Sequence, residues 1–79
     1  MNAKINIMEA KELINIDPEI MSGVPVFRGT RVPIRTLFDY IANGYTLEEF
    51  LDSFPSVTLE AARGVLALSE RSIVRAAAA

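Results

Sequence analysis

Residues 33–58, PIRTLFDYIANGYTLEEFLDSFPSVT, decide the fold of this chain. Their apolar residues recur at i, i+3, i+4 and i+7, which is the spacing of one buried face of an amphipathic helix. The first helix is predicted to begin near Pro33 and to end at Gly44, because proline suits a helix start and glycine suits a helix end. The second opens with Thr46 and Glu49, which match a capping box, and ends before Pro55. The two apolar stripes are Ile34, Leu37, Phe38 and Ile41, then Leu47, Phe50, Leu51 and Phe54.

A third helix is predicted after Thr58, whose hydroxyl suits an N-cap, with Glu60 in the first turn favouring the helix dipole. The alanines of residues 76–79 form a tail that can extend this helix or fray, because alanine has the highest helix propensity. Three short amphipathic helices bury their stripes against one another, which predicts a three-helix bundle over residues 33–75. The expected buried stripe of the third helix is Leu59, Ala62, Leu66, Ser69 and Ile73, widened by Val65 and Leu68.

The segment before the bundle predicts a short two-stranded β-arm over residues 13–31. Residues 13–16 alternate and include β-branched side chains, which is typical of a strand. Asp17-Pro18 and Ser22-Gly23 suit chain reversals, and residues 24–27 read as a second strand that Pro25 confines to an edge. Residues 1–12 are expected to be flexible, with a weak helical tendency near residues 8–13. The 79 residues therefore predict one mainly α domain.

The composition argues against catalysis. The chain contains neither histidine nor cysteine, which removes the usual general base and the commonest zinc ligands. The acids Glu48, Glu49 and Asp52 splay around the second helix and are interpreted as a solvated face. We therefore expect no enzyme activity, no cofactor, no metal and no small-molecule substrate. Neither a secretory signal nor a membrane span is apparent, so we expect a cytoplasmic protein without a membrane partner.

Charge is distributed unevenly along the chain, whose formal net charge is −2. Residues 20–38 carry three arginines and no acid, whereas residues 39–54 carry four acids and no base. We call residues 23–35, GVPVFRGTRVPIR, the basic hook, because two glycines and two prolines restrict its backbone. Arg28 and Arg35 are expected to face an acidic partner, while Arg31 lies close to the first helix and suits a structural role. Phe27, Tyr40 and Tyr45 are candidate aromatic anchors for that partner.

The third helix offers a second candidate surface. Arg63, Ala67, Arg71 and Arg75 recur every four residues and are expected to share one side of the helix. The second and third helices have the lengths of a helix-turn-helix, in which the third would enter the DNA major groove. Arginine suits guanine edges and phosphates, so Arg63, Arg71 and Arg75 are candidate nucleic-acid contacts. The alternative is a solvated face, because Glu60 and Glu70 flank the same stripe.

Several motifs together resemble one bacterial and archaeal family. They are the run from Ile16 to Pro33 with its Asp-Pro-Glu start and Gly-Thr-Arg-x-Pro core, followed by residues 39–44, 46–51 and 54–55. The family is domain of unknown function four hundred and thirty-three, also described as VapB-like antitoxins. The resemblance implies a homeodomain-like, winged-helix-like three-helix bundle preceded by a short β-arm. The apolar 54–57 turn and the alanine-rich end depart from the family pattern.

The resemblance also implies a function. It implies the antitoxin of a type II toxin–antitoxin pair, which neutralises a PIN-like ribonuclease toxin and autoregulates its operon by binding operator DNA. Such nucleases hold Mg²⁺ among carboxylates, which complements a cationic inhibitor. The matching toxin-binding candidates are Arg28, Arg31 and Arg35, with Phe27 beside them.

Two other functions fit the residues. One is a stand-alone helix-turn-helix regulator that acts through the third helix. The other is an oligomerisation module without a nucleic-acid role. Hydrophobic residues make up 51% of so short a chain, which favours an apolar interface in a homodimer or higher oligomer.

Overall fold

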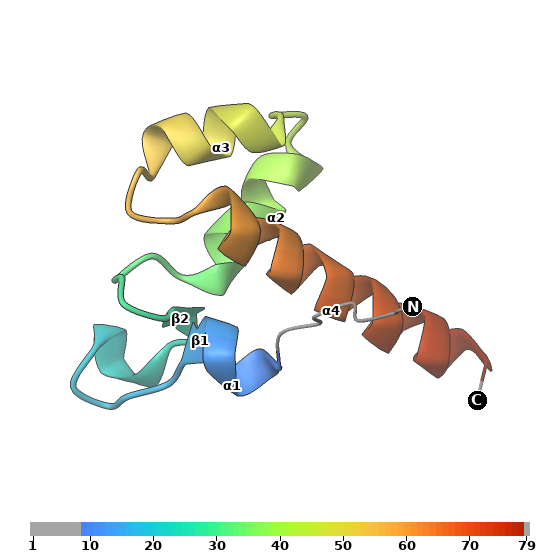
Figure 1. Ribbon diagram of the computed structural model, residues 1–79, viewed down its shortest axis with the longest axis horizontal. Helices are drawn as coiled ribbons and strands as arrows, with labels where there is room; N and C mark the ends of the chain where they lie inside the picture. The colour runs from blue at the N-terminus through green and yellow to red at the C-terminus, as the bar shows by residue number, and fades with distance from the viewer. Residues whose placement is uncertain (1–8, 79) are drawn as a thin grey trace, which may run out of the picture.

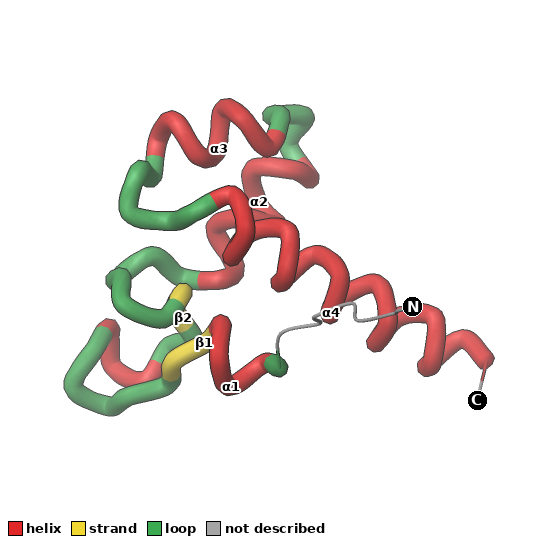
Figure 2. Tube along the Cα trace, in the orientation of Figure 1, coloured by secondary structure: helices red, strands yellow, loops and turns green. Residues whose placement is uncertain are grey.

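The computed structural model describes residues 9–78 and shows a helical body with a small two-stranded sheet (Figure 1). The prediction of a mainly α fold with a three-helix bundle and a short β-arm is confirmed. Short connections join the elements (Figure 2). In chain order the elements are α1 (Ala10–Leu13), β1 (Ile14–Asn15), the 3₁₀ turn η1 (Met21–Gly23), β2 (Val26–Phe27), α2 (Ile34–Ala42), α3 (Leu47–Ser53) and α4 (Leu59–Ala78).

Local signals fix the boundaries of the three bundle helices. Gly44 has a φ of 87°, the left-handed conformation that ends α2. The predicted capping box is present at α3, where Thr46 Oγ1 accepts a hydrogen bond from Glu49 N at 3.0 Å and Glu49 Oε1 accepts one from Thr46 N at 2.8 Å. Thr58 Oγ1 caps α4 by accepting a hydrogen bond from Ala61 N at 3.0 Å. These three helix ends lie where the sequence predicts them.

The β-arm is shorter than predicted. β1 and β2 pair antiparallel, with Ile14 opposite Phe27. Asp17 starts the expected turn, since its Oδ1 accepts a hydrogen bond from Glu19 N at 2.8 Å. Leu13, expected in a strand, instead ends α1, so the helical tendency near this point prevails. Residues 10–12 are likewise helical rather than flexible, and residues 1–8 lie outside the described part of the chain.

The arm and the bundle share one hydrophobic core. Phe27 of β2 packs against Phe50 of α3, with ring centroids 6.1 Å apart. Leu37 of α2 and Ala62 of α4 are each 0% exposed within the same cluster. The arm therefore braces the bundle rather than projecting from it.

Gly64 allows α1 to pack against α4. A Cβ atom at this position would lie 2.8 Å from Leu13 Cδ1, which is closer than such atoms approach. Leu13 is 3% exposed, so its side chain is held in the core at this contact. The sequence offers no local signal for this role, because it depends on a residue 51 positions away in the chain.

The second half of α4 extends beyond the body (Figure 1). Ile73 is 66% exposed and Leu59 is 44% exposed, so the prediction that both are buried is wrong. In the stripe, Ala62 and Val65 are buried, and Leu66, Leu68 and Ser69 are half-buried. The helix continues to Ala78, past the predicted end of the bundle at residue 75, and Ala79 lies outside the described residues. We call residues 70–78 the α4 end.

Candidate interaction surfaces

The tip of the basic hook is a rigid turn between β2 and α2. Thr30 donates its hydroxyl to Phe27 O at 2.8 Å, and Thr30 Oγ1 accepts a hydrogen bond from Val32 N at 3.0 Å. Gly29 has a φ of 81°, which a residue with a side chain adopts only under strain. Phe27 N donates to Val32 O at 2.9 Å, which closes the turn. The backbone positions of Arg28 and Arg31, on either side of Gly29 and Thr30, are therefore fixed.

Arg28 has a structural role. Its Nε donates to Lys11 O at 3.0 Å and its Nη2 donates to Ile14 O at 3.1 Å. These carbonyls belong to the C-terminal end of α1, where a cation is favourable and the free carbonyls need donors. The prediction that Arg28 projects toward a partner is therefore corrected: its guanidinium caps α1 and ties it to β2.

All three arginines of the hook are exposed, but Arg28 is held by backbone carbonyls, which leaves Arg31 and Arg35 as the candidates for a partner. Among residues 9–78, no hydrogen bond or ion pair engages the Arg31 guanidinium, which reverses the expected division of roles between Arg28 and Arg31. The Arg35 side chain is 86% exposed, and its Nε lies 3.8 Å from Asp39 Oδ2. A pair this exposed is weak and readily exchanged for another anion. Ile34 N donates to Pro25 O at 3.0 Å, which brings exposed Val24 close to the start of α2.

Phe27 is not available to a partner. It is 1% exposed and belongs to the core, so its prediction as an aromatic anchor is wrong. Both residues of β2 are buried, and the strand contacts β1 and α2. Tyr45, also weighed as an anchor, is 51% exposed and does reach the surface.

The arginines of α4 are exposed but do not form one straight stripe. A four-residue step advances about 400° around an α-helix, so the direction drifts by about 40° per step. Arg63 and Arg75 are three such steps apart, and their side chains therefore leave the helix about 120° apart. Arg71 and Arg75 remain neighbours on the α4 end, whereas Arg63 lies on another side.

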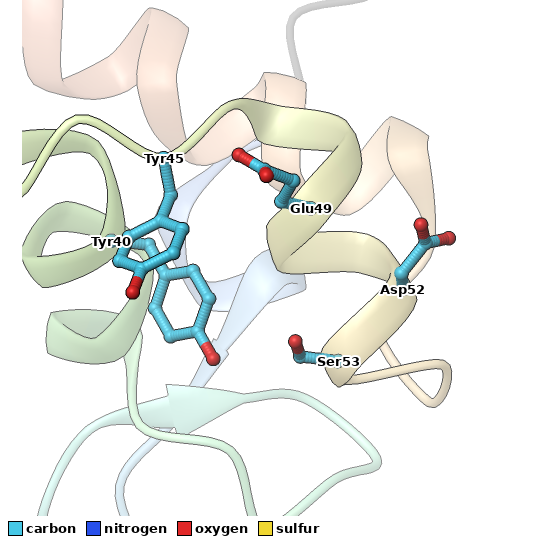
Figure 3. Close-up of a pocket in the computed structure, with 5 residues that line it drawn as sticks. All are labelled: Tyr40, Tyr45, Glu49, Asp52 and Ser53. Atoms are coloured by element: carbon cyan, nitrogen blue, oxygen red, sulfur yellow. The ribbon is translucent and has the colours of Figure 1, made fainter.

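A surface pocket gathers two tyrosines and two acids at the junction of α2 and α3 (Figure 3). Its volume is about 420 Å³, and the Tyr40 and Tyr45 rings are 5.0 Å apart. Tyr40 is held from behind by Phe54, with ring centroids 5.6 Å apart. The sequence identified the tyrosines as anchors and the acids as a solvated face, but nothing in it showed that they meet. We call this the acid–aromatic pocket, lined by Tyr40, Tyr45, Glu49, Asp52 and Ser53.

Two further observations concern the described residues alone. Within residues 9–78, no three side chains of His, Cys, Asp or Glu converge to hold a metal ion. Among the helices of the same region, none combines the length and the apolar character needed to cross a membrane.

Comparisons with known proteins agree with this architecture. The family model described as Protein of unknown function (DUF433) matches residues 14–68. The Uncharacterized protein y4eO of Sinorhizobium fredii is 36% identical over 58 residues, which cover 73% of this chain and 26% of that protein. The chain thus spans about a quarter of the length of this relative.

A solved structure supports the same relationship. The crystal structure of a DUF433 member protein from Anabaena variabilis superposes with a TM-score of 0.66 at 28% sequence identity. The match covers 82% of this chain and 64% of that one. The chain therefore belongs to the DUF433 family.

Proposed function

We propose that this DUF433 protein is the antitoxin of a type II toxin–antitoxin pair and that it neutralises a PIN-like ribonuclease. The hook carries the contact. Arg31 and Arg35 present their guanidinium groups to a carboxylate-lined, Mg²⁺-binding cleft, with exposed Val24 as an adjoining apolar contact. A nuclease whose cleft is filled in this way cannot admit RNA.

One observation supports the proposal above the others: Arg31 in a rigid turn and Arg35 in the first turn of α2 are both exposed, on a chain that is acidic overall. Residues 20–38 contribute three positive charges, while the whole chain has a net charge of −2. Because the turn is closed by the Thr30 hydrogen bonds, little backbone conformational entropy is lost when a partner binds. Complementary charge speeds the encounter and selects an acidic surface.

The test uses the product of the neighbouring gene. Co-expression followed by co-purification shows whether the two proteins bind, and RNA cleavage is then measured with and without this chain. We expect inhibition by the unmodified protein and a loss of roughly tenfold or more in inhibitory potency for the double variant Arg31→Ala/Arg35→Ala. Arg63→Glu, which lowers the net charge by the same two units on another surface, is the control. Unchanged cleavage in the presence of the unmodified protein would refute the proposal.

Operator binding is the second candidate function, and the α3–turn–α4 arrangement favours it. Arg63, Arg71 and Arg75 are exposed on the helix that would enter the major groove. The charge of α3 opposes it, because that helix would cross the phosphates while carrying Glu48, Glu49 and Asp52 and no cation. We therefore rank it below the protein contact.

Gel-shift titration over a range of salt concentrations tests operator binding. Specific binding should weaken with a log–log slope of about one for each phosphate contact. Replacing both Arg63 and Arg71 with alanine should then reduce the slope by about two. Promoter affinity that is unaltered in this double variant would exclude α4 as the DNA contact.

A further inference from the structure

Two surfaces outside the hook are complementary to each other. The acid–aromatic pocket belongs to a part of the chain, residues 39–54, with four acids and no base. The α4 end carries Arg71 and Arg75 beside Val74, which is 59% exposed. One surface offers carboxylates and tyrosine rings, and the other offers guanidinium groups and an aliphatic side chain.

The pocket has the features that recognise a guanidinium group. Tyrosine faces attract cations, and arginine stacks on them more readily than lysine does. Glu49 is fixed in place by its capping bond to Thr46 N at 2.8 Å, so its carboxylate needs little further ordering on binding. Tyr45 lies over Tyr40 and borders the pocket with its ring, and Glu49 lies on the facing side (Figure 3).

The α4 end is suited to insertion. It continues about 13 Å along the helix axis from residue 70 to residue 78 and lies outside the body of the molecule (Figure 1). A shallow hollow on it is lined by Glu70, Arg71, Val74, Arg75 and Ala78. Val74 and Ile73, at 59% and 66% exposed, place two consecutive apolar side chains on the surface of the α4 end.

The α4 end cannot fill the pocket of its own chain. Figure 1 shows α3 on one side of the molecule and the C-terminal end of α4 on the opposite side. Because α4 is a continuous helix, it cannot fold back toward α3. A second copy of the chain brings the two surfaces together.

We propose that the α4 end of one copy docks on the acid–aromatic pocket of a second copy. Arg71 and Arg75 face Glu49 and Asp52, and Val74 packs against the exposed ring of Tyr45. The contact joins two different surfaces of the chain. A two-fold symmetric dimer therefore contains the contact twice, and a ring with higher rotational symmetry contains it once between each pair of neighbours. It does not involve Arg31 or Arg35 and is independent of the nuclease proposal.

A charge swap tests this contact by sedimentation velocity. Asp52→Lys places a cation in the pocket, and Arg75→Glu places an anion on the α4 end. Each variant alone should associate at least tenfold more weakly than the unmodified protein, because like charges then oppose each other. An equimolar mixture of the two variants should regain association. In one contact the new Lys at position 52 faces the new Glu at position 75, and in the other contact the native Asp52 faces the native Arg75.

Matched controls separate this effect from a change in net charge. Glu60→Lys and Arg63→Glu make the same charge changes on exposed parts of α4 outside both surfaces, and they should leave association unaltered. Circular dichroism verifies that each variant remains helical. An unmodified protein that sediments as a monomer at high micromolar concentration overturns the proposal. So does a mixture of the two swapped variants that stays monomeric. Binding of an arginine-rich peptide by such a monomer would assign the pocket to a different chain.

Discussion

Replacing Gly64 with alanine sets two effects of known size against each other. In the interior of a helix, alanine is more favourable than glycine by about 1 kcal/mol. The new methyl group, however, would lie 2.8 Å from Leu13 Cδ1 and 3.4 Å from Leu13 Cδ2. Overpacking of this kind costs about 1–3 kcal/mol. We expect Gly64→Ala to lower the free energy of unfolding by about 1 kcal/mol, because Leu13 is 3% exposed and its side chain can move aside only by displacing its neighbours in the core.

In the background of a second substitution, the effect of Gly64→Ala on the free energy of unfolding is expected to change sign. Leu13→Val removes both Cδ atoms and costs about 1 kcal/mol through the lost methylene. In that background the alanine methyl no longer meets them, so Gly64→Ala should raise stability by about 1 kcal/mol. The coupling between the two positions is then about 2 kcal/mol, which is within the range for residues in contact.

Urea unfolding followed by circular dichroism measures the free energy of unfolding of the unmodified protein, the two single variants and the double variant. A domain of this length is expected to have about 4–12 kcal/mol of stability, so every variant remains folded. Near the melting midpoint, 1 kcal/mol corresponds to about 4–8 °C. If Gly64→Ala stabilised the unmodified protein, α1 would not pack against α4 as described, and the reasoning would be refuted.

Three pairs of substitutions test separate features of the fold. Thr46→Ala removes the α3 cap and should cost about 1 kcal/mol, whereas Thr46→Ser should be nearly neutral; equal losses in thermal unfolding would contradict the capping role. Arg28→Ala removes two hydrogen bonds to the end of α1 and should cost about 1 kcal/mol in urea unfolding, while Arg31→Ala should stay within about 0.5 kcal/mol. Val65→Ala should cost about 2 kcal/mol in the same assay, because Val65 is buried. Ile73→Ala should cost less than about 0.5 kcal/mol at concentrations where the protein is monomeric, because Ile73 is exposed. The reverse order of the two losses would place the α4 end in the core.

The helix boundaries were predictable because their causes are local. Gly44, the Thr46–Glu49 box and Thr58 each act within four residues of a helix end, so the sequence alone displays them. The apolar spacing likewise indicated which side of each helix faces the core. It did not show how far along α4 the body extends, and Ile73 has the periodicity of a core residue although nothing in residues 9–78 covers it.

The side-chain roles in the hook were not predictable because they depend on distant contacts. Arg28 and Arg31 lie three residues apart in the same segment of sequence, and only the position of α1 decides that Arg28 is its cap. Phe27 follows Val26, and a strand with both residues buried departs from the alternation expected of an exposed arm. Gly64 and the acid–aromatic pocket likewise require elements that the sequence places far apart.

The positions of the surfaces allow self-association and nuclease binding to occur together. The turn between β2 and α2 lies on the far side of the molecule from the C-terminal end of α4 (Figure 1). Neither Arg31 nor Arg35 lines the acid–aromatic pocket or the hollow on the α4 end. Arg75→Glu should therefore abolish association while leaving the inhibition per protomer unchanged, and Arg31→Ala/Arg35→Ala should do the opposite. Loss of both properties in Arg75→Glu would mean that the hook is completed only in the assembled form, and loss of both in Arg31→Ala/Arg35→Ala would mean that the hook takes part in association.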